Sequence, residues 1–200
     1  MEKKRIAVLV SGGGINLQAL IDAQNTGIIH SGSIELVISN NPNAYALERA
    51  AKAHIVSRVV TKKECGSQEA FEQRIKELLT ANRIDLVILA GFMSILTESF
   101  TKDYPERILN VHPSLIPSFC GKGYYGLRVH EEVLRYGVKV TGATVHFVNE
   151  IPDGGKILLQ KAVDVKEGDT PEVLQRRVME QAEWQILPAA TEMVCKSMKS

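Results

Sequence analysis

The sequence IAVLVSGGG, residues 6–14, decides the fold class of this chain. Its five consecutive apolar residues predict a strand that is buried on both faces, as the strands of a parallel sheet are. Three glycines follow, and residues 16–25 then carry Leu17, Leu20 and Ile21 at helical spacing. The stretch therefore predicts a strand, a tight glycine loop and a helix, which together begin a βαβ unit.

The same alternation of apolar runs and amphipathic segments continues along the chain. Further strands are expected at residues 34–38, 55–60, 84–89 and 107–111, and helices at 44–53 and 67–81. After Gly137 an alternating pattern predicts an antiparallel pair at 138–148 and 156–165. A last helix is expected from Thr170 to residue 185, with Pro188 ending it or starting a separate piece. We expect a doubly wound, Rossmann-like α/β fold, with a mostly parallel sheet and an antiparallel edge pair near the C-terminal half.

Composition narrows the class of protein. The chain has 200 residues, with 24 basic and 23 acidic side chains and a net charge of +1. This length suits one domain over residues 1–200. The neutral balance gives no general reason to expect nucleic acid or membrane as a partner, so an anionic ligand needs a local site. Three scattered cysteines fit reduced thiols, and the apolar run 6–10 is too short for a signal peptide, so we expect a cytoplasmic protein.

The loop from Ser11 to Asn16 is the expected anion site. The first backbone N–H groups of a helix are unpaired, and the helix dipole favours negative charge there. A dinucleotide fingerprint would need a third glycine where Leu17 stands, and no Gly-Lys-Ser/Thr follows. NAD and an ATP P-loop are therefore disfavoured, and a phosphomonoester is favoured over a turn without ligand.

His112 closes the expected strand 107–111, and Asn110 lies on the same side of that strand. One side chain can hold a carbonyl oxygen and the other can transfer a proton. A buried polar pair that merely holds the turn is equally open. Asp153 precedes two glycines and reads first as a turn residue. If its loop folds over the carboxyl edge of the sheet, it meets His112 and raises the pKa of that imidazole.

The other four histidines are less informative. His30, His54 and His130 are expected to be solvated or locally hydrogen-bonded. His146 alternates within a strand, so its role stays open, with structural support favoured. No histidine spacing suggests a metal site.

Four motifs together resemble one enzyme family. They are SGGGINLQA (11–19), AGFM (90–93), NVHPSLIP (110–117) and GATVHFV (142–148) continuing to DGG (153–155). The chain resembles the phosphoribosylglycinamide formyltransferases, folate-dependent enzymes of purine synthesis. The resemblance implies transfer of the formyl group of 10-formyltetrahydrofolate to the amine of glycinamide ribonucleotide, with both small molecules as partners and no metal.

The resemblance also implies roles for particular residues. Asn110 and His112 would stabilise the oxyanion, and His112 would protonate the departing folate nitrogen while Asp153 keeps it charged. The implied substrate contacts are Gly13, Gly14, Ile15, Asn16 and Glu183. The implied folate contacts are Gln68, Met93, Ser94, Ile95, Leu96, Asn110, Asn149, Glu150, Ile151, Pro152 and Asp153.

Three positions depart from the family pattern. Gln68 and Ser94 stand where relatives often carry a basic residue near the folate, and Pro152 replaces an aliphatic residue. Two sibling activities are less favoured, because a methionyl-tRNA formyltransferase or a formyltetrahydrofolate hydrolase needs an extra domain. A catalytically silent nucleotide-binding module is the remaining alternative. We expect a monomer or homodimer, with 118–126 as a mobile flap.

Overall fold

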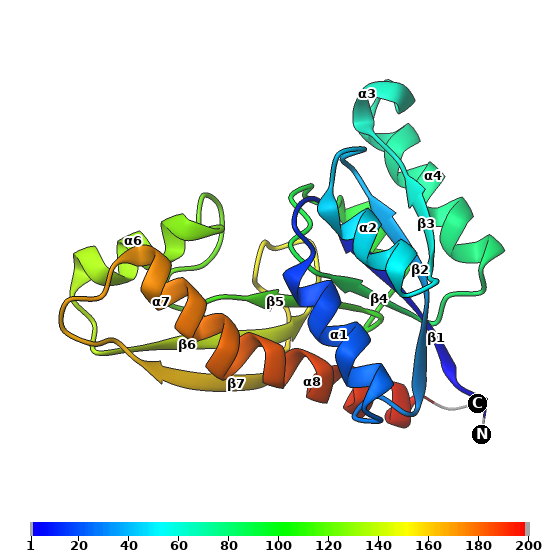
Figure 1. Ribbon diagram of the computed structural model, residues 1–200. Coiled ribbons are helices and arrows are strands. Elements are labelled where there is room, and N and C mark those ends of the chain that lie inside the picture. Colours follow the sequence, from blue (N-terminus) through cyan, green and yellow to red (C-terminus); the bar gives the residue numbers. More distant parts are fainter. Residues whose placement is uncertain (1, 199–200) are drawn as a thin grey trace.

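A single seven-stranded sheet runs through the protein in a computed structural model, which describes residues 2–198 (Figure 1). The strands are β1 (Lys4–Val10), β2 (Gly32–Ser39), β3 (Val56–Val59), β4 (Leu86–Leu89), β5 (Ile108–His112), β6 (Val140–Phe147) and β7 (Ile157–Asp164). Their order across the sheet is β3-β2-β1-β4-β5-β6-β7. The first five strands run parallel, whereas β6 is antiparallel to β5 and β7 to β6. All seven predicted strands and the antiparallel edge pair are confirmed.

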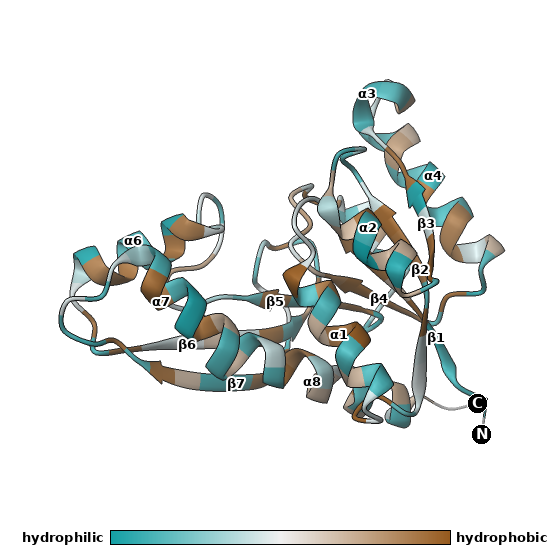
Figure 2. Ribbon diagram, in the orientation of Figure 1, coloured by the Kyte–Doolittle hydropathy of each residue, from teal (hydrophilic) through white to brown (hydrophobic). Residues whose placement is uncertain are grey.

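Helices cover both faces of this sheet. They are α1 (Ile15–Asn25), α2 (Tyr45–Lys52), α3 (Lys62–Cys65), α4 (Gln68–Ala81), α5 (Glu98–Lys102), α6 (Leu127–Tyr136), α7 (Pro171–Val178), the π-helical turn η1 (Met179–Glu183) and α8 (Trp184–Ser197). One apolar core lies under α1, α2, α7 and α8, and a second lies under α4 and α5. Figure 2 shows hydrophobic colour concentrated in central strands such as β4. None of the helices in the described range is long and apolar enough to cross a membrane.

The C-terminal helical segment differs from the prediction. Thr170 caps α7 as expected, because its hydroxyl accepts the N–H of Val173 and Pro171 occupies the first turn. Pro188, however, lies inside α8 and neither ends the helix nor starts a new piece. A proline removes one backbone hydrogen-bond donor, but its fixed φ still suits a helix. The burial of the apolar face of α8 in the core offsets the loss of that hydrogen bond.

The strand order determines where a ligand can bind. The chain adds strands outward on one side from β1 to β3, then returns to place β4 on the other side of β1. In open α/β sheets, ligands bind at the carboxyl ends of the strands on either side of such a reversal. The functional site is therefore expected where β1 and β4 end, with β5 beside them.

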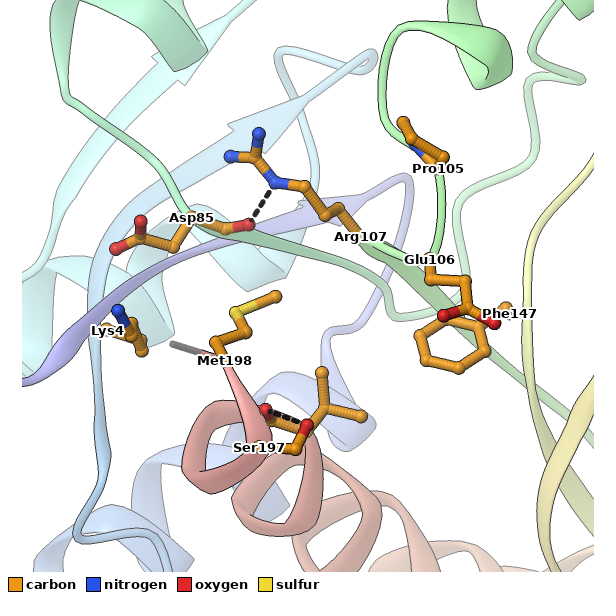
Figure 3. A pocket seen from close by; sticks show the side chains of 9 residues that line it. Lys4, Asp85, Pro105, Glu106, Arg107, Phe147, Ser197 and Met198 are labelled. Atoms are coloured by element: carbon orange, nitrogen blue, oxygen red, sulfur yellow. Dashed lines mark hydrogen bonds between the residues drawn. The ribbon is translucent and has the colours of Figure 1, made fainter. Parts of the chain in front are cut away.

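A hollow of about 400 Å³ lies at the opposite ends of the central strands (Figure 3). Several of its polar groups already have partners. Arg107, for example, donates from Nε to the carbonyl of Asp85 at 2.7 Å, and Glu106 pairs with Lys156 at 3.3 Å. This hollow faces the amino ends of β1, β4 and β5, and we assign it no ligand.

Candidate active site

A cavity of about 730 Å³ opens at the carboxyl ends of β4 and β5 and reaches the start of α1. The loop after β4, the end of β5, the loop that precedes α6, and η1 contribute its walls. His112, Asn110, Asp153, Asn16 and Glu183 all line this one cavity. The structure thus brings together five residues that are spread over most of the sequence.

Asn110 and His112 both lie within direct reach of Asp153. The Nδ1 atom of His112 is 3.5 Å from Asp153 Oδ2, and Asn110 Nδ2 donates to Asp153 Oδ1 at 3.4 Å. Asp153 is therefore more than a turn residue, because its loop does fold over the carboxyl edge of the sheet. Its φ of 56° is a left-handed conformation, which aspartate tolerates better than most residues.

Glycine is required two positions after this aspartate. A Cβ atom built on Gly155 would lie 1.7 Å from the carbonyl oxygen of Phe147, so no larger residue allows the loop to pass so close to β6. The Asp-Gly-Gly sequence thus combines a carboxylate with a close backbone approach. This local packing carries Asp153 to β5.

The loop between β5 and α6 holds the two charged groups in place. The Nε2–H of His112 donates to the carbonyl of Phe119 at 2.8 Å, and the backbone N–H of Gly121 donates to Asp153 Oδ2 at 2.8 Å. Because Nε2 is occupied, Nδ1 is the nitrogen that remains for chemistry on the cavity side. The mobility expected for 118–126 stays a prediction.

The pKa of His112 contradicts the sequence-based expectation. Burial lowers it below the ordinary value, and the charge of Asp153 and the hydrogen bond to Phe119 only partly oppose that effect. Burial acts on Asp153 as well and raises its pKa, but the contact with His146, the charge of His112 and the Gly121 amide outweigh this and lower the pKa overall. The charge of Asp153 therefore does not raise the pKa of His112 above its ordinary value.

His146, whose role the sequence left open, supports this centre from the neighbouring strand. Antiparallel pairing places it directly opposite Asn110, and the side chain is 1% exposed. Its Nδ1–H donates to the carbonyl of Phe147 at 2.8 Å, which leaves Nε2 to accept from Asn110 Nδ2 at 3.2 Å. His146 therefore orients the amide of Asn110.

The prediction for His130 is wrong. It is fully buried on α6, whereas polar neighbours in the sequence suggested a solvated side chain. Neither ring nitrogen has a hydrogen-bond partner among the described residues, and burial lowers its pKa to about 4. The predictions for His54, which is exposed, and for His30, which pairs with Glu192 at 3.1 Å, are confirmed.

The glycine loop forms the expected turn at the start of α1. Gly14 has a φ of 69°, and a Cβ atom there would lie 2.6 Å from the Cβ atom of Ala46. Arg49 braces the loop, because its Nε donates to the carbonyl of Gly13 at 2.8 Å. The first turn of α1 carries no acidic residue, so nothing in it opposes an anion at the helix N-terminus. Ile15 is 44% exposed beside it.

Glu183 reaches the same end of the cavity from the π-helical turn. Its carboxylate accepts a hydrogen bond from Asn16 Nδ2 at 2.9 Å, and the residue is 4% exposed. Burial raises its pKa to about 7, although the Asn16 hydrogen bond opposes the change. A π turn adds a residue to the helical repeat and often marks a functional position. The sequence did not predict this turn.

A smaller cavity of about 130 Å³ adjoins Asn110 and Asp153 on the other side. The expected folate residues that line it are Ser94, Ile95, Leu96, Asn149, Glu150, Ile151 and Pro152. Met93 lines the larger cavity instead and is 56% exposed. Gln68 is absent from the described lining of both cavities, because its amide donates to Glu72 and to the carbonyl of Ile95.

Comparison with known proteins is consistent across sequence and structure. A family model described as "Formyl transferase" matches residues 4–191. The phosphoribosylglycinamide formyltransferase of Haemophilus influenzae is 43% identical over 185 residues, which are 92% of this chain and 84% of that protein. Glycinamide ribonucleotide transformylase 1 from Symbiobacterium toebii superposes with a TM-score of 0.90 at 42% identity, covering 97% of this chain and 88% of that one.

Some relatives are much longer. The trifunctional purine biosynthetic protein adenosine-3 of Bos taurus is 47% identical over 195 residues, or 96% of this chain. This chain spans only 18% of the length of that relative. The match therefore concerns one part of a larger protein.

Proposed function

The chain belongs to the formyl transferase family, and from that premise we propose that it moves the formyl group of 10-formyltetrahydrofolate to the amine of glycinamide ribonucleotide. The observation that carries the proposal is the cavity at the end of β5. There, His112 and Asp153 meet Asn110 between a helix N-terminus on one side and a second cavity on the other. The seven strands forming one sheet support a single domain over residues 1–200.

The ribonucleotide fits the end of the cavity at α1. We propose that the backbone amides of Gly13, Gly14, Ile15 and Asn16 hold its phosphate, since a helix N-terminus offers unpaired donors and a favourable dipole. Glu183, beside Asn16, is in reach of hydroxyl groups on the sugar. The amine at the far end of the substrate would then point toward His112.

The pterin of the folate fits the smaller cavity. Apolar side chains of Leu89, Leu96 and Val148 line it, and the backbone of residues 149–153 borders it with polar groups. This combination of an apolar slot and a few fixed polar groups is typical of small-molecule sites. It would bring the formyl group beside Asn110 and Asp153.

The chemistry assigned to the three central residues follows from their free atoms. The amine attacks the formyl carbon, a carbon–nitrogen bond forms, and negative charge develops on the formyl oxygen. In its charged form His112 also carries a hydrogen on Nδ1, and this Nδ1–H would donate to that oxygen, because Nε2–H is committed to Phe119. Asn110 would supply a second donor by exchanging its long, 3.4 Å bond to Asp153 for one to the oxyanion.

Proton transfer completes the reaction. The bond from the formyl carbon to the folate nitrogen breaks, that nitrogen takes a proton, and the amine loses one. Asp153, whose pKa is lowered, is ionised and can accept the amine proton, directly or through water. His112 can deliver a proton to the leaving nitrogen once the anionic substrates favour its charged form.

The test is formyl transfer by purified protein with both substrates and no added metal, followed by mass detection of the N-formyl product. The His112→Ala variant is the matched control, with strongly reduced activity expected. Methionyl-tRNA as acceptor, or water in the absence of ribonucleotide, tests the two sibling activities. No N-formyl product from folded protein would overturn the proposal. The cytoplasmic location and the monomer-or-homodimer state stay predictions.

A further inference from the structure

Glu72 is a buried carboxylate that lies outside the reaction centre. It projects from α4 and is 4% exposed. Its Oε1 accepts from Gln68 Nε2 at 2.8 Å and from the backbone N–H of Thr97 at 2.7 Å, and its Oε2 accepts from the Thr97 hydroxyl at 2.5 Å. Within residues 2–198 no cation forms an ion pair with it. Three neutral donors therefore balance this charge.

Burying the Glu72 carboxylate costs free energy of folding, and what the carboxylate provides in return is a fixed geometry. Removing a carboxylate from water costs free energy that hydrogen bonds from neutral groups only partly return. An apolar side chain would fill the same space on α4 at lower cost. What Glu72 adds is a defined position for Thr97, which begins α5 and ends the loop that follows β4.

That loop, residues 91–97, carries Ser94, Ile95 and Leu96, which line the smaller cavity assigned above to the folate. We call these three residues the folate wall. Three further hydrogen bonds fasten the loop to other strand ends and to α4. They are Met93 N to Ser11 Oγ (2.8 Å), Asn40 Nδ2 to Ser94 Oγ (2.8 Å) and Gln68 Nε2 to the carbonyl of Ile95 (3.2 Å). A loop without helix or strand is thus held along its whole length by side chains.

The hydrogen bonds of this loop also explain two positions, 68 and 94, at which the sequence departs from the family pattern. Gln68 and Ser94 do not carry the positive charge that relatives often place near the folate. Instead, the Gln68 amide spends its donors on Glu72 and Ile95, and the Ser94 hydroxyl accepts from Asn40. Both side chains therefore hold the shape of the folate wall, and neither brings a positive charge to an anionic tail.

We propose that Glu72, acting through Gln68 and Thr97, is a positioning residue that sets the shape of the folate wall. This inference rests on the proposed function, because it takes loop 91–97 as the folate side of the site. Glu72 touches no reacting atom. Its effect is on the affinity for the formyl donor, with the affinity for the ribonucleotide and the chemical step unchanged.

Three variants test the role, with Gln73→Met as the control because it changes an exposed residue of the same helix. Gln68→Met and Glu72→Gln should each raise KM for 10-formyltetrahydrofolate by roughly tenfold, the equivalent of one charge-assisted hydrogen bond. KM for the ribonucleotide and kcat at saturation should stay within about twofold. Thr97→Val also removes the hydroxyl that caps α5, so it should raise this KM at least as much as Glu72→Gln does, and the double variant should be no worse than Thr97→Val alone.

Hydrogen exchange supplies a readout that needs no turnover. The Thr97 amide should exchange roughly tenfold faster in Glu72→Gln than in wild type, whereas amides in β4 should not change. Equal rises in both KM values together with a lowered Tm would mean that Glu72 is only structural and would overturn the proposal. If wild type transfers no formyl group but the Thr97 amide responds as stated, the proposed function fails and the positioning of the loop stands.

Discussion

The buried carboxyl of Glu183 allows a quantitative prediction for stability against pH. In the unfolded chain this group titrates at its ordinary value of 4.5, and in the folded protein burial raises its pKa to about 7. Between those values the folded state holds a proton that the unfolded state has lost. Each pKa unit is worth about 1.4 kcal/mol, so the change corresponds to about 3 kcal/mol.

Because the folded state binds this extra proton, the contribution of this group to the free energy of unfolding falls as the pH rises. The contribution of Glu183 to stability is fully present below pH 4.5, declines as the pH rises toward 7, and is lost above it. Glu183→Gln carries no titrating group at this position. The free energy of unfolding of wild type minus that of Glu183→Gln should therefore fall by about 3 kcal/mol between pH 4.5 and pH 8.

The measurement is urea unfolding of both proteins at half-unit pH steps, followed by the fluorescence of Trp184, the single tryptophan of the chain. Glu180→Gln is the matched control, because Glu180 lies in the same π turn but is exposed. Parallel curves for wild type and Glu183→Gln across the whole range would refute the argument that this carboxyl is buried and titrates near neutrality.

Four further predictions concern single side chains. His112→Ala should fold normally yet lose about 10²–10³ in kcat, which steady-state kinetics with circular dichroism as a folding check will measure. Asp153→Asn removes the charge that raises the pKa of His112, so the limb of the pH–rate profile that follows His112 should move to lower pH. The pKa of His130 is lowered to about 4, so the free energy of unfolding of wild type minus that of His130→Leu, measured by the same urea unfolding, should fall by about 3 kcal/mol as pH falls from 6.5 toward 4. Ser11→Ala removes the acceptor of a Met93 amide that joins the two binding loops, so KM for both substrates should rise several-fold in initial-rate assays.

The parallel part of the fold was predictable because its central strands, such as β1 and β4, are buried on both faces. Five unbroken apolar residues in β1 and four in β4 leave no alternative to a covered parallel strand, and the glycine loop marks the crossover. The antiparallel pair was predictable for the complementary reason, since alternation appears only after Gly137. The pattern of apolar residues along the sequence was enough to predict these strands, and no tertiary contact was needed.

Much of the central site was also within reach of the sequence. The spacing of Asn110 and His112 predicted that both lie on the same side of a strand. Their contact with Asp153 could not be predicted, because Asp153 lies about 40 residues further along the chain and reaches them through the fold of its loop. His130 was misjudged because Glu131 and Glu132 follow it. Val129 and Val133 share its buried face, and a helical stripe through them was the signal that could have found it.

The features that stayed hidden depend on contacts between distant elements. Glu72 looks like an ordinary solvent-facing residue on an amphipathic helix, and only the return of Thr97 to α4 gives it a role. The π turn that aims Glu183 at Asn16 changes the helical phase by one residue, which hydrophobic periodicity over a short window does not resolve.

The charge balance of the site follows from the same structure. Apart from histidines, the charged side chains that line the larger cavity in the described residues are Lys122, Asp153 and Glu183. Two carboxylates and one ammonium do not form a basic pocket, although both proposed substrates are anionic. The backbone N–H groups at α1 therefore supply attraction for the ribonucleotide, and protonation of Glu183 near pH 7 removes one repelling negative charge from that end of the cavity. On this argument, affinity for the ribonucleotide in Glu183→Gln should lose the pH dependence that wild type shows around pH 7, and calorimetric titration at pH 6 and pH 8 will measure it. An unchanged pH dependence in the variant would assign that titration to the phosphate itself.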